Sequence, residues 1–200
     1  MTKSSQITRL AVISAIVFLG FAIDTLLRNV FAFQIAVVSL IAVLTVVVLC
    51  PLREGVVAGL ALGVFSMIRA FVMPSVATAL TMENFWISFT NPLIAILPRA
   101  LIAVTAKFTF LRLKSWSKNF TLSCAVSSAV GTMTNTALVC VVMLIMKAIF
   151  VPDFALWEFI VGFFTVNCIV EVVVCTIVVP MLASGLSKSV YFKTKKKGDN

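Results

Sequence analysis

The chain has 200 residues, of which 62% are hydrophobic and 12% are charged, and it contains no histidine. A soluble domain of this length could not bury so much apolar surface, so the composition excludes an ordinary soluble protein and predicts an integral membrane protein. The formal net charge of +9 agrees with this class, because Lys and Arg gather at the cytoplasmic ends of membrane spans.

Apolar stretches of spanning length recur six times between short polar breaks. They predict an all-α integral membrane protein, a six-transmembrane-helix bundle that forms a single domain over residues 1–200. The first stretch follows the N-terminus directly and carries no small-residue cleavage site, so we expect an uncleaved first helix. The predicted spans are Ile7–Leu27, Phe31–Cys50, Arg53–Val72, Phe85–Leu111, Phe120–Ile149 and Leu156–Leu186.

Small residues recur at helical spacing in the first and third predicted spans. The first span carries Ala11 and Ala15, and the third carries Gly55, Gly59 and Gly63. Such stripes let helix backbones approach closely, which stabilises helix pairs in a membrane through van der Waals contact. Packing within the chain is the default interpretation of each stripe, and the alternative is a docking surface for a partner helix.

Charged residues also occur toward the outer ends of these two spans. Asp24 and Arg28 lie four residues apart in the first span, so we expect an interfacial ion pair between them. Arg69 in the third span either extends its guanidinium toward the outer interface or faces the bundle interior as a site residue.

The link between the third and fourth spans is too long for a tight turn and is rich in aromatic residues. It carries Phe85, Trp86 and Phe89. Aromatic side chains of this kind favour the membrane interface. We expect the link to form both an interfacial belt and a lid over a cavity that opens outward.

The fourth predicted span begins with a segment, FTNPLIAILPRALIA, that places polar and helix-breaking residues in a membrane helix. Pro92 and Pro98 each remove a helical hydrogen bond, and Pro98 frees a carbonyl near Ile94. Freed carbonyls at membrane depth are tolerated only beside protein or a polar cavity, and the charge of Arg99 has the same requirement. The segment therefore predicts the wall of an enclosed polar site that includes Asn91 and Arg99.

Polar residues of the last two spans fall at the depth of Arg99. With a rise of about 1.5 Å per residue, Asn135, Asn167 and Glu171 lie between the mid-membrane and its outer third. Arg99 and Glu171 either form a structural ion pair or contact a ligand, and the two roles can coexist. The candidate substrate-binding residues are Asn91, Arg99, Asn135, Asn167, Glu171, Arg69 and Trp86.

Basic residues collect on one side of the predicted bundle. Six spans place both termini on that side, together with the breaks after the second and fourth spans. By the positive-inside rule this side is cytoplasmic, which also explains the basic tail at about 187–200 without a nucleic-acid partner. The basic residues on this side are Lys3, Arg9, Arg53, Arg112, Lys114, Lys118, Lys188, Lys193, Lys195, Lys196 and Lys197.

The sequence gives no support for a metal site or an enzyme. Its five cysteines form no CxxC pair and have no histidine companions, so we expect no metal, disulfide framework or cofactor in this chain. Neither the P-loop pattern G-x-x-x-x-G-K-[ST] nor a G-x-S-x-G elbow is present. One alternative is a stand-alone, proton-coupled carrier that uses Glu171 and Asp24 as proton sites, although the two halves show no evident inverted repeat.

The six spans, the Ala11-x-x-x-Ala15 pair and the segment NPLIAILPR together resemble the substrate-binding S components of energy-coupling factor (ECF) vitamin transporters. The resemblance covers essentially the whole chain and is greatest to the branch that includes pantothenate and folate carriers. In that family the S component captures a vitamin from outside and docks on a transmembrane coupling subunit, the T component, which is held by two cytoplasmic ATPases. The resemblance implies that Ala11 and Ala15 meet the coupling subunit, that partners hydrolyse ATP, and that the chain lies in a prokaryotic plasma membrane.

The family also implies that substrate contacts come from spans four to six and the outer loops. Arg99 favours a ligand carboxylate, and the asparagines suit hydroxyl or amide groups. Pantothenate has one carboxylate, an amide and two hydroxyls, so it fits this set best. Folate would require more aromatic side chains deep in the cavity for stacking. A folate or riboflavin S component is the alternative.

Overall fold

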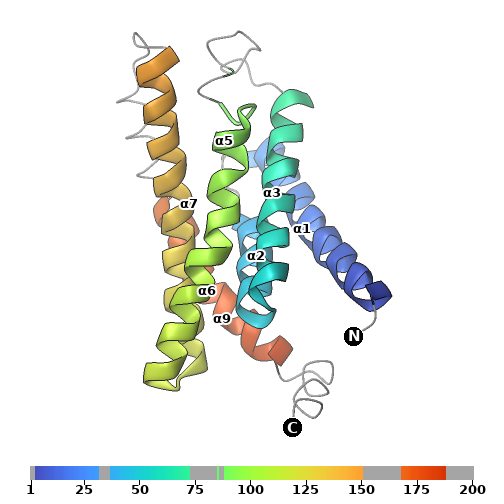
Figure 1. Cartoon of the computed structure of the whole chain (residues 1–200), viewed down its shortest axis with the longest axis vertical. Coiled ribbons are helices and arrows are strands. Elements are labelled where there is room, and N and C mark those ends of the chain that lie inside the picture. Colours follow the sequence, from blue (N-terminus) through green and yellow to red (C-terminus); the bar gives the residue numbers. More distant parts are fainter. Residues whose placement is uncertain (1–2, 32–36, 73–84, 86–87, 151–167, 188–200) are drawn as a thin grey trace.

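In the computed structural model the described residues are 3–31, 37–72, 85, 88–150 and 168–187, and within these ranges the chain is helical and contains no strand (Figure 1). The prediction of an all-α protein is therefore confirmed. The helices are α1 (Lys3–Phe31), α2 (Val37–Leu49), α3 (Leu52–Val72), α5 (Pro92–Ala95), α6 (Leu97–Ser117), α7 (Phe120–Phe150) and α9 (Ile169–Ser187).

Five segments are long and apolar enough to cross a membrane, namely α1, α3, the α5–α6 segment, α7 and α9. The apolar helix α2 has 13 residues, about 20 Å of helix, which is shorter than a hydrocarbon core of about 30 Å. The chain is thus a multi-pass membrane protein. The count of six spans stays a prediction, because segments 32–36 and 151–167, parts of the second and sixth predicted spans, lie outside the described residues.

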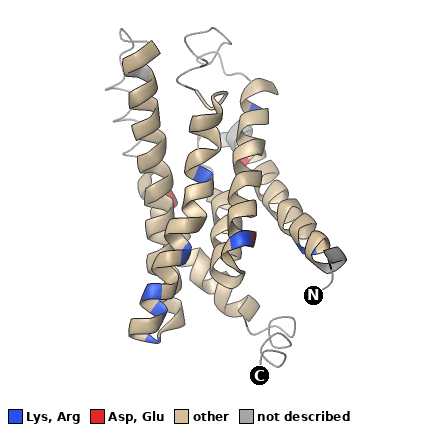
Figure 2. Cartoon of the chain, in the orientation of Figure 1, with Lys and Arg blue, Asp and Glu red and all other residues tan. Residues whose placement is uncertain are grey.

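The ends of the bundle agree with the predicted topology. The start of α1, the end of α9 and the α2–α3 and α6–α7 turns lie at the same end of the bundle (Figure 1). Lys and Arg residues also gather at this end (Figure 2), and the last turns of α6 carry Arg112 and Lys114. A cytoplasmic location for this end remains a prediction from the positive-inside rule.

Helix α2 is surrounded by protein, since it packs against α1, α3, α6, α7 and α9. Its sequence is apolar all round, as expected of a helix with no solvent-facing side. Leu40, Val43, Leu44 and Val47 are buried at its centre. The outer faces of the neighbouring helices instead expose large apolar side chains, which suits contact with lipid.

The two small-residue stripes have different surroundings. Gly55, Gly59 and Gly63 are buried, and they face α2 and the α5–α6 segment. These contacts agree with packing within the chain, and a partner-docking role for this stripe stays a prediction. Ala11 and Ala15 are exposed on the outside of α1.

Candidate ligand-binding site

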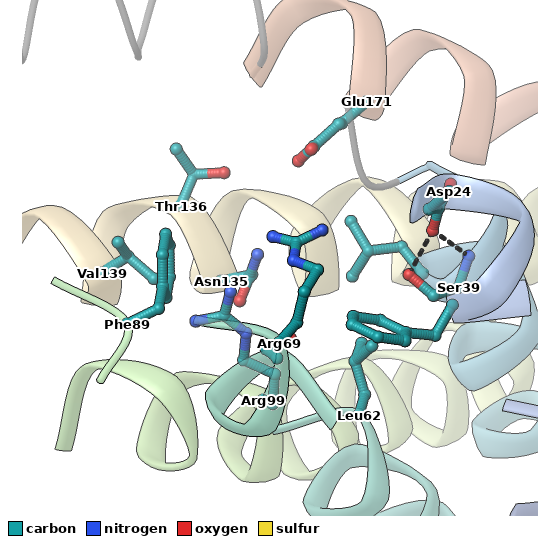
Figure 3. Close-up of a pocket in the computed structure, with 13 residues that line it drawn as sticks. Asp24, Ser39, Leu62, Arg69, Phe89, Arg99, Asn135, Thr136, Val139 and Glu171 are labelled. Atoms are coloured by element: carbon teal, nitrogen blue, oxygen red, sulfur yellow. Dashed lines mark hydrogen bonds between the residues drawn. The ribbon is translucent and has the colours of Figure 1, made fainter. Parts of the chain in front are cut away.

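A cavity of about 50 Å³ lies inside the bundle and receives side chains from α1, α2, α3, α6, α7 and α9 (Figure 3). A buried water needs about 10–15 Å³ of such space, so the cavity has room for about four. The charged residues that line the cavity are Asp24, Arg69, Arg99 and Glu171.

The wall nearest to Arg99 is built by an interruption between α5 and α6. Asn91 caps α5, and its side-chain oxygen accepts a hydrogen bond from the Leu93 N–H at 3.0 Å. Pro98 has no N–H, so the carbonyl of Ile94 receives no helical hydrogen bond from the residue one turn later. Arg99 Nη1 donates to this carbonyl at 2.8 Å. The predicted free carbonyl is thus confirmed, and its partner is the neighbouring arginine.

The guanidinium of Arg99 is buried, with 9% of the residue exposed, and it lies over the ring of Phe89 at 4.6 Å from the centroid. A guanidinium has five N–H donors. Within the described part of the chain, the bond to Ile94 is its one hydrogen bond. The group therefore retains donors for an anion, and it lies at the cavity surface (Figure 3).

An unpartnered acceptor lies beside this cation. Asn135 of α7 is 8% exposed, and its Oδ1 atom is buried without a hydrogen-bond partner among the described residues. Figure 3 shows its side chain next to that of Arg99 at the cavity. A buried acceptor without a partner costs about 1–3 kcal/mol. A ligand hydroxyl or amide N–H at this position would remove that cost.

The other side of the cavity carries Arg69 and Glu171. Arg69 of α3 lies over the ring of Phe21 at 5.3 Å from the centroid, so it faces the bundle interior rather than the outer interface. Glu171 of α9 is buried and points toward the same space (Figure 3). The hydrogen bond of Arg99 goes to a backbone carbonyl, so its place in the structure does not depend on a bond to Glu171.

Asp24 holds α1 to the first turn of α2. Its carboxylate accepts hydrogen bonds from the N–H groups of Val38 at 2.9 Å and Ser39 at 2.8 Å, and from the Ser39 hydroxyl. The first N–H groups of a helix have no internal acceptor and favour negative charge, which explains this contact. Sequence analysis paired Asp24 with Arg28 at the interface. The carboxylate is instead buried against α2, and the side chain of Arg28 lies outside the described set.

The structure brings four of the predicted substrate-binding residues together at the cavity, namely Arg69, Arg99, Asn135 and Glu171. Another predicted residue, Asn91, caps α5 instead of lining the cavity. Trp86 and Asn167 lie outside the described residues, as does most of the link that was expected to form a lid.

Sequence reasoning missed several residues of the lining. Ser39, Ser66 and Thr136 contribute polar groups, and Phe21 supplies the ring under Arg69. Serine, threonine and phenylalanine are common in membrane helices, so the sequence contained no signal for these four residues. Phe89, whose ring lies under Arg99, belongs to the aromatic link that was expected to cover a cavity. Asp24 also lines the cavity, whereas the sequence had indicated an interfacial partner of Arg28 or a proton site.

Comparison with known families adds one finding. The family model for the substrate-specific component of ECF transporters matches residues 5–183. No curated protein gives a significant match to the chain.

Proposed function

This chain belongs to the family of substrate-specific components of ECF transporters, and on that premise we propose that its cavity binds a small water-soluble vitamin carrying one negative charge, with pantothenate as the best candidate. The observation that carries this proposal is the pair formed by Arg99 and Asn135. Both side chains are buried and line the same cavity, where Arg99 offers unused donors and Asn135 offers an unused acceptor.

The charged lining favours a ligand that brings a carboxylate to Arg99. The lining has two cations, Arg69 and Arg99, and two carboxylates, Asp24 and Glu171, so its formal charges cancel. Asp24 is held by three hydrogen bonds from the start of α2, whereas Arg99 retains N–H donors at the cavity. A ligand carboxylate suits these donors. Riboflavin is neutral and has no carboxylate for them, and folate brings two negative charges into the membrane, so both fit less well than pantothenate.

The functional groups of pantothenate also match the geometry. Its carboxylate suits the planar fork of Arg99, and a hydroxyl or its amide N–H can donate to Asn135. The cavity has room for only a few waters. A vitamin must therefore displace them and move lining side chains, and rotamer changes of this kind are common on binding.

We also propose that α1 docks on the coupling subunit through Ala11 and Ala15. Both alanines are exposed on the outer face of α1, where a partner helix can approach their backbone. Two cytoplasmic ATPases on the partner side would supply the energy. The termini would then lie in the cytoplasm and the cavity would open toward the outside of a prokaryotic plasma membrane.

The competing proposal is a stand-alone proton-coupled carrier. Such a carrier needs a membrane carboxylate that exchanges protons freely. Asp24 instead anchors α1 to the first turn of α2 through three hydrogen bonds, which is a structural role. The family match favours the binding-subunit proposal.

Equilibrium binding of labelled pantothenate, folate and riboflavin to the purified full-length chain in detergent tests the substrate. We expect saturable binding of pantothenate at a lower concentration than the other two. Tighter binding of riboflavin or folate would contradict the charge argument, and binding of none of them would reject these vitamins as substrates.

A further inference from the structure

The buried glycines of α3 face the interruption between α5 and α6. A Cβ atom added to Gly59 would lie 2.2 Å from the carbonyl oxygen of Arg99, and one added to Gly63 would lie 2.8 Å from the Cα of Ile96. Both neighbours are backbone atoms, which cannot rotate away as a side chain can. Helix α3 therefore packs directly on the stretch of backbone that carries Arg99.

The two positions require glycine for space rather than for backbone conformation. Neither has a positive φ, so an alanine would meet no conformational obstacle of its own. The stripe thus allows a close approach that any side chain would prevent.

This contact fixes both arginines of the cavity relative to each other. Arg69 lies on α3 beyond Gly63, and Arg99 lies in the first turn of α6. One place where the two helices touch closely is Gly59 against the Arg99 backbone. A shift of α6 away from α3 would move Arg99 relative to Arg69 and change how its guanidinium meets the cavity.

We propose that Gly59, assisted by Gly63, is a positioning residue for the anion-binding site. It seats the start of α6 so that Arg99 holds the Ile94 carbonyl with one N–H and presents the others to the ligand carboxylate. This inference rests on the proposed function, because it assumes that Arg99 binds an anion.

The test compares Gly59→Ala with Gly185→Ala, whose added Cβ would meet no atom within 4 Å. The probes are pantothenate and pantothenol, in which an alcohol replaces the carboxylate. For Gly59→Ala we expect pantothenate affinity to fall about tenfold or more, toward the level of Arg99→Ala, while pantothenol affinity stays within about twofold. Gly185→Ala should leave both affinities unchanged.

Two further variants separate positioning from general damage. Adding Gly59→Ala to Arg99→Ala should cause little additional loss, because the group being positioned is already absent. Gly63→Ala creates a less severe contact, so it should lose pantothenate affinity selectively but to a smaller extent. It replaces Gly59→Ala in the test if that variant does not fold. Equal loss of both probes, or a wild-type ratio of the two affinities in both glycine variants, would overturn the inference.

A measurement without ligand distinguishes this inference from the proposed function. The amides of Ile94, Ala95, Ile96 and Ala100 form the hydrogen bonds around the interruption. Their hydrogen exchange should be faster in Gly59→Ala or Gly63→Ala than in the wild type and in Gly185→Ala. Unchanged exchange would reject the positioning role. Faster exchange in a chain whose wild type does not bind pantothenate would support the positioning role and reject the proposed substrate.

Discussion

Replacement of Arg99 by alanine removes the cation on which the proposed site depends. In the structure Arg99 gives one N–H to Ile94 and lies over Phe89, which leaves its other donors for the ligand. A charge-assisted hydrogen bond is worth about 1.5–3 kcal/mol, and about 1.4 kcal/mol corresponds to a tenfold change in affinity. Arg99→Ala should therefore weaken pantothenate binding by about one to two orders of magnitude. Arg99→Lys should restore only part of this loss, because an ammonium lacks the bidentate fork.

The assay is equilibrium binding of labelled pantothenate to protein shown to be folded and monodisperse in detergent. Arg112→Ala is the matched control, because Arg112 lies on the same helix but is exposed at its far end. It should bind pantothenate like the wild type. Thermal unfolding of each variant should be recorded as well, since Arg99→Ala also strands the carbonyl of Ile94.

A double variant decides between ligand contact and a purely structural ion pair. If Arg99 and Glu171 served only each other, Arg99→Met combined with Glu171→Met would recover both stability and binding. We expect it to recover stability at most, because the ligand would still lack its cation. Near-wild-type affinity in the double variant would refute the assignment of Arg99 to the site.

Three other predictions test separate parts of the account. Ala11→Trp or Ala15→Trp should preserve pantothenate affinity but prevent co-purification with the coupling subunit. The control Ala137→Trp, at an exposed position of α7, should assemble normally. Assembly of all three variants would exclude α1 as the docking face. Asp24→Asn should lower the midpoint of thermal unfolding, because an amide nitrogen cannot accept the bonds from α2, at a cost of about 1–3 kcal/mol; an unchanged midpoint would contradict the anchoring role. Asn135→Leu should keep or raise the midpoint of thermal unfolding, because it removes a buried acceptor without a partner. It should also weaken pantothenate binding, because the ligand loses that acceptor. Unchanged affinity would remove Asn135 from the site.

Local chemistry explains what could be predicted from the sequence around Arg99. Proline lacks an N–H in any tertiary context, so a free carbonyl near Ile94 followed directly from Pro98. The cost of a charge in a membrane likewise required a buried partner for Arg99. The sequence did not reveal that Arg99 itself donates a hydrogen bond to the free carbonyl of Ile94. This contact reaches back five residues along the chain, and it depends on where the helix breaks.

The position of the break was not predicted. The prolines indicated lost helical hydrogen bonds within a single span, Phe85–Leu111, but not where a helix would end. The structure has one apolar segment, Pro92–Ser117, which is divided into the short helix α5 and helix α6 beginning at Leu97. The apolar pattern continues through Ile96, so hydropathy alone does not mark the end of α5.

Long-range contacts account for the remaining differences. The contact between Asp24 and Ser39 joins two helices whose relative placement the sequence does not encode locally. The stripes on α1 and α3 have the same spacing, yet Ala15 is exposed and Gly59 is buried. Spacing alone identifies a surface that allows close approach, whereas the bundle decides which helix occupies that surface.

The central claim is that this chain binds its vitamin but depends on partners to accumulate it. The most direct test measures labelled pantothenate retained by proteoliposomes that contain only this chain, with and without an imposed proton gradient. We predict that retained label saturates at or below the amount of protein and does not respond to the gradient. Accumulation far beyond the amount of protein, driven by the gradient and released by an ionophore, would show a self-sufficient carrier and contradict the account.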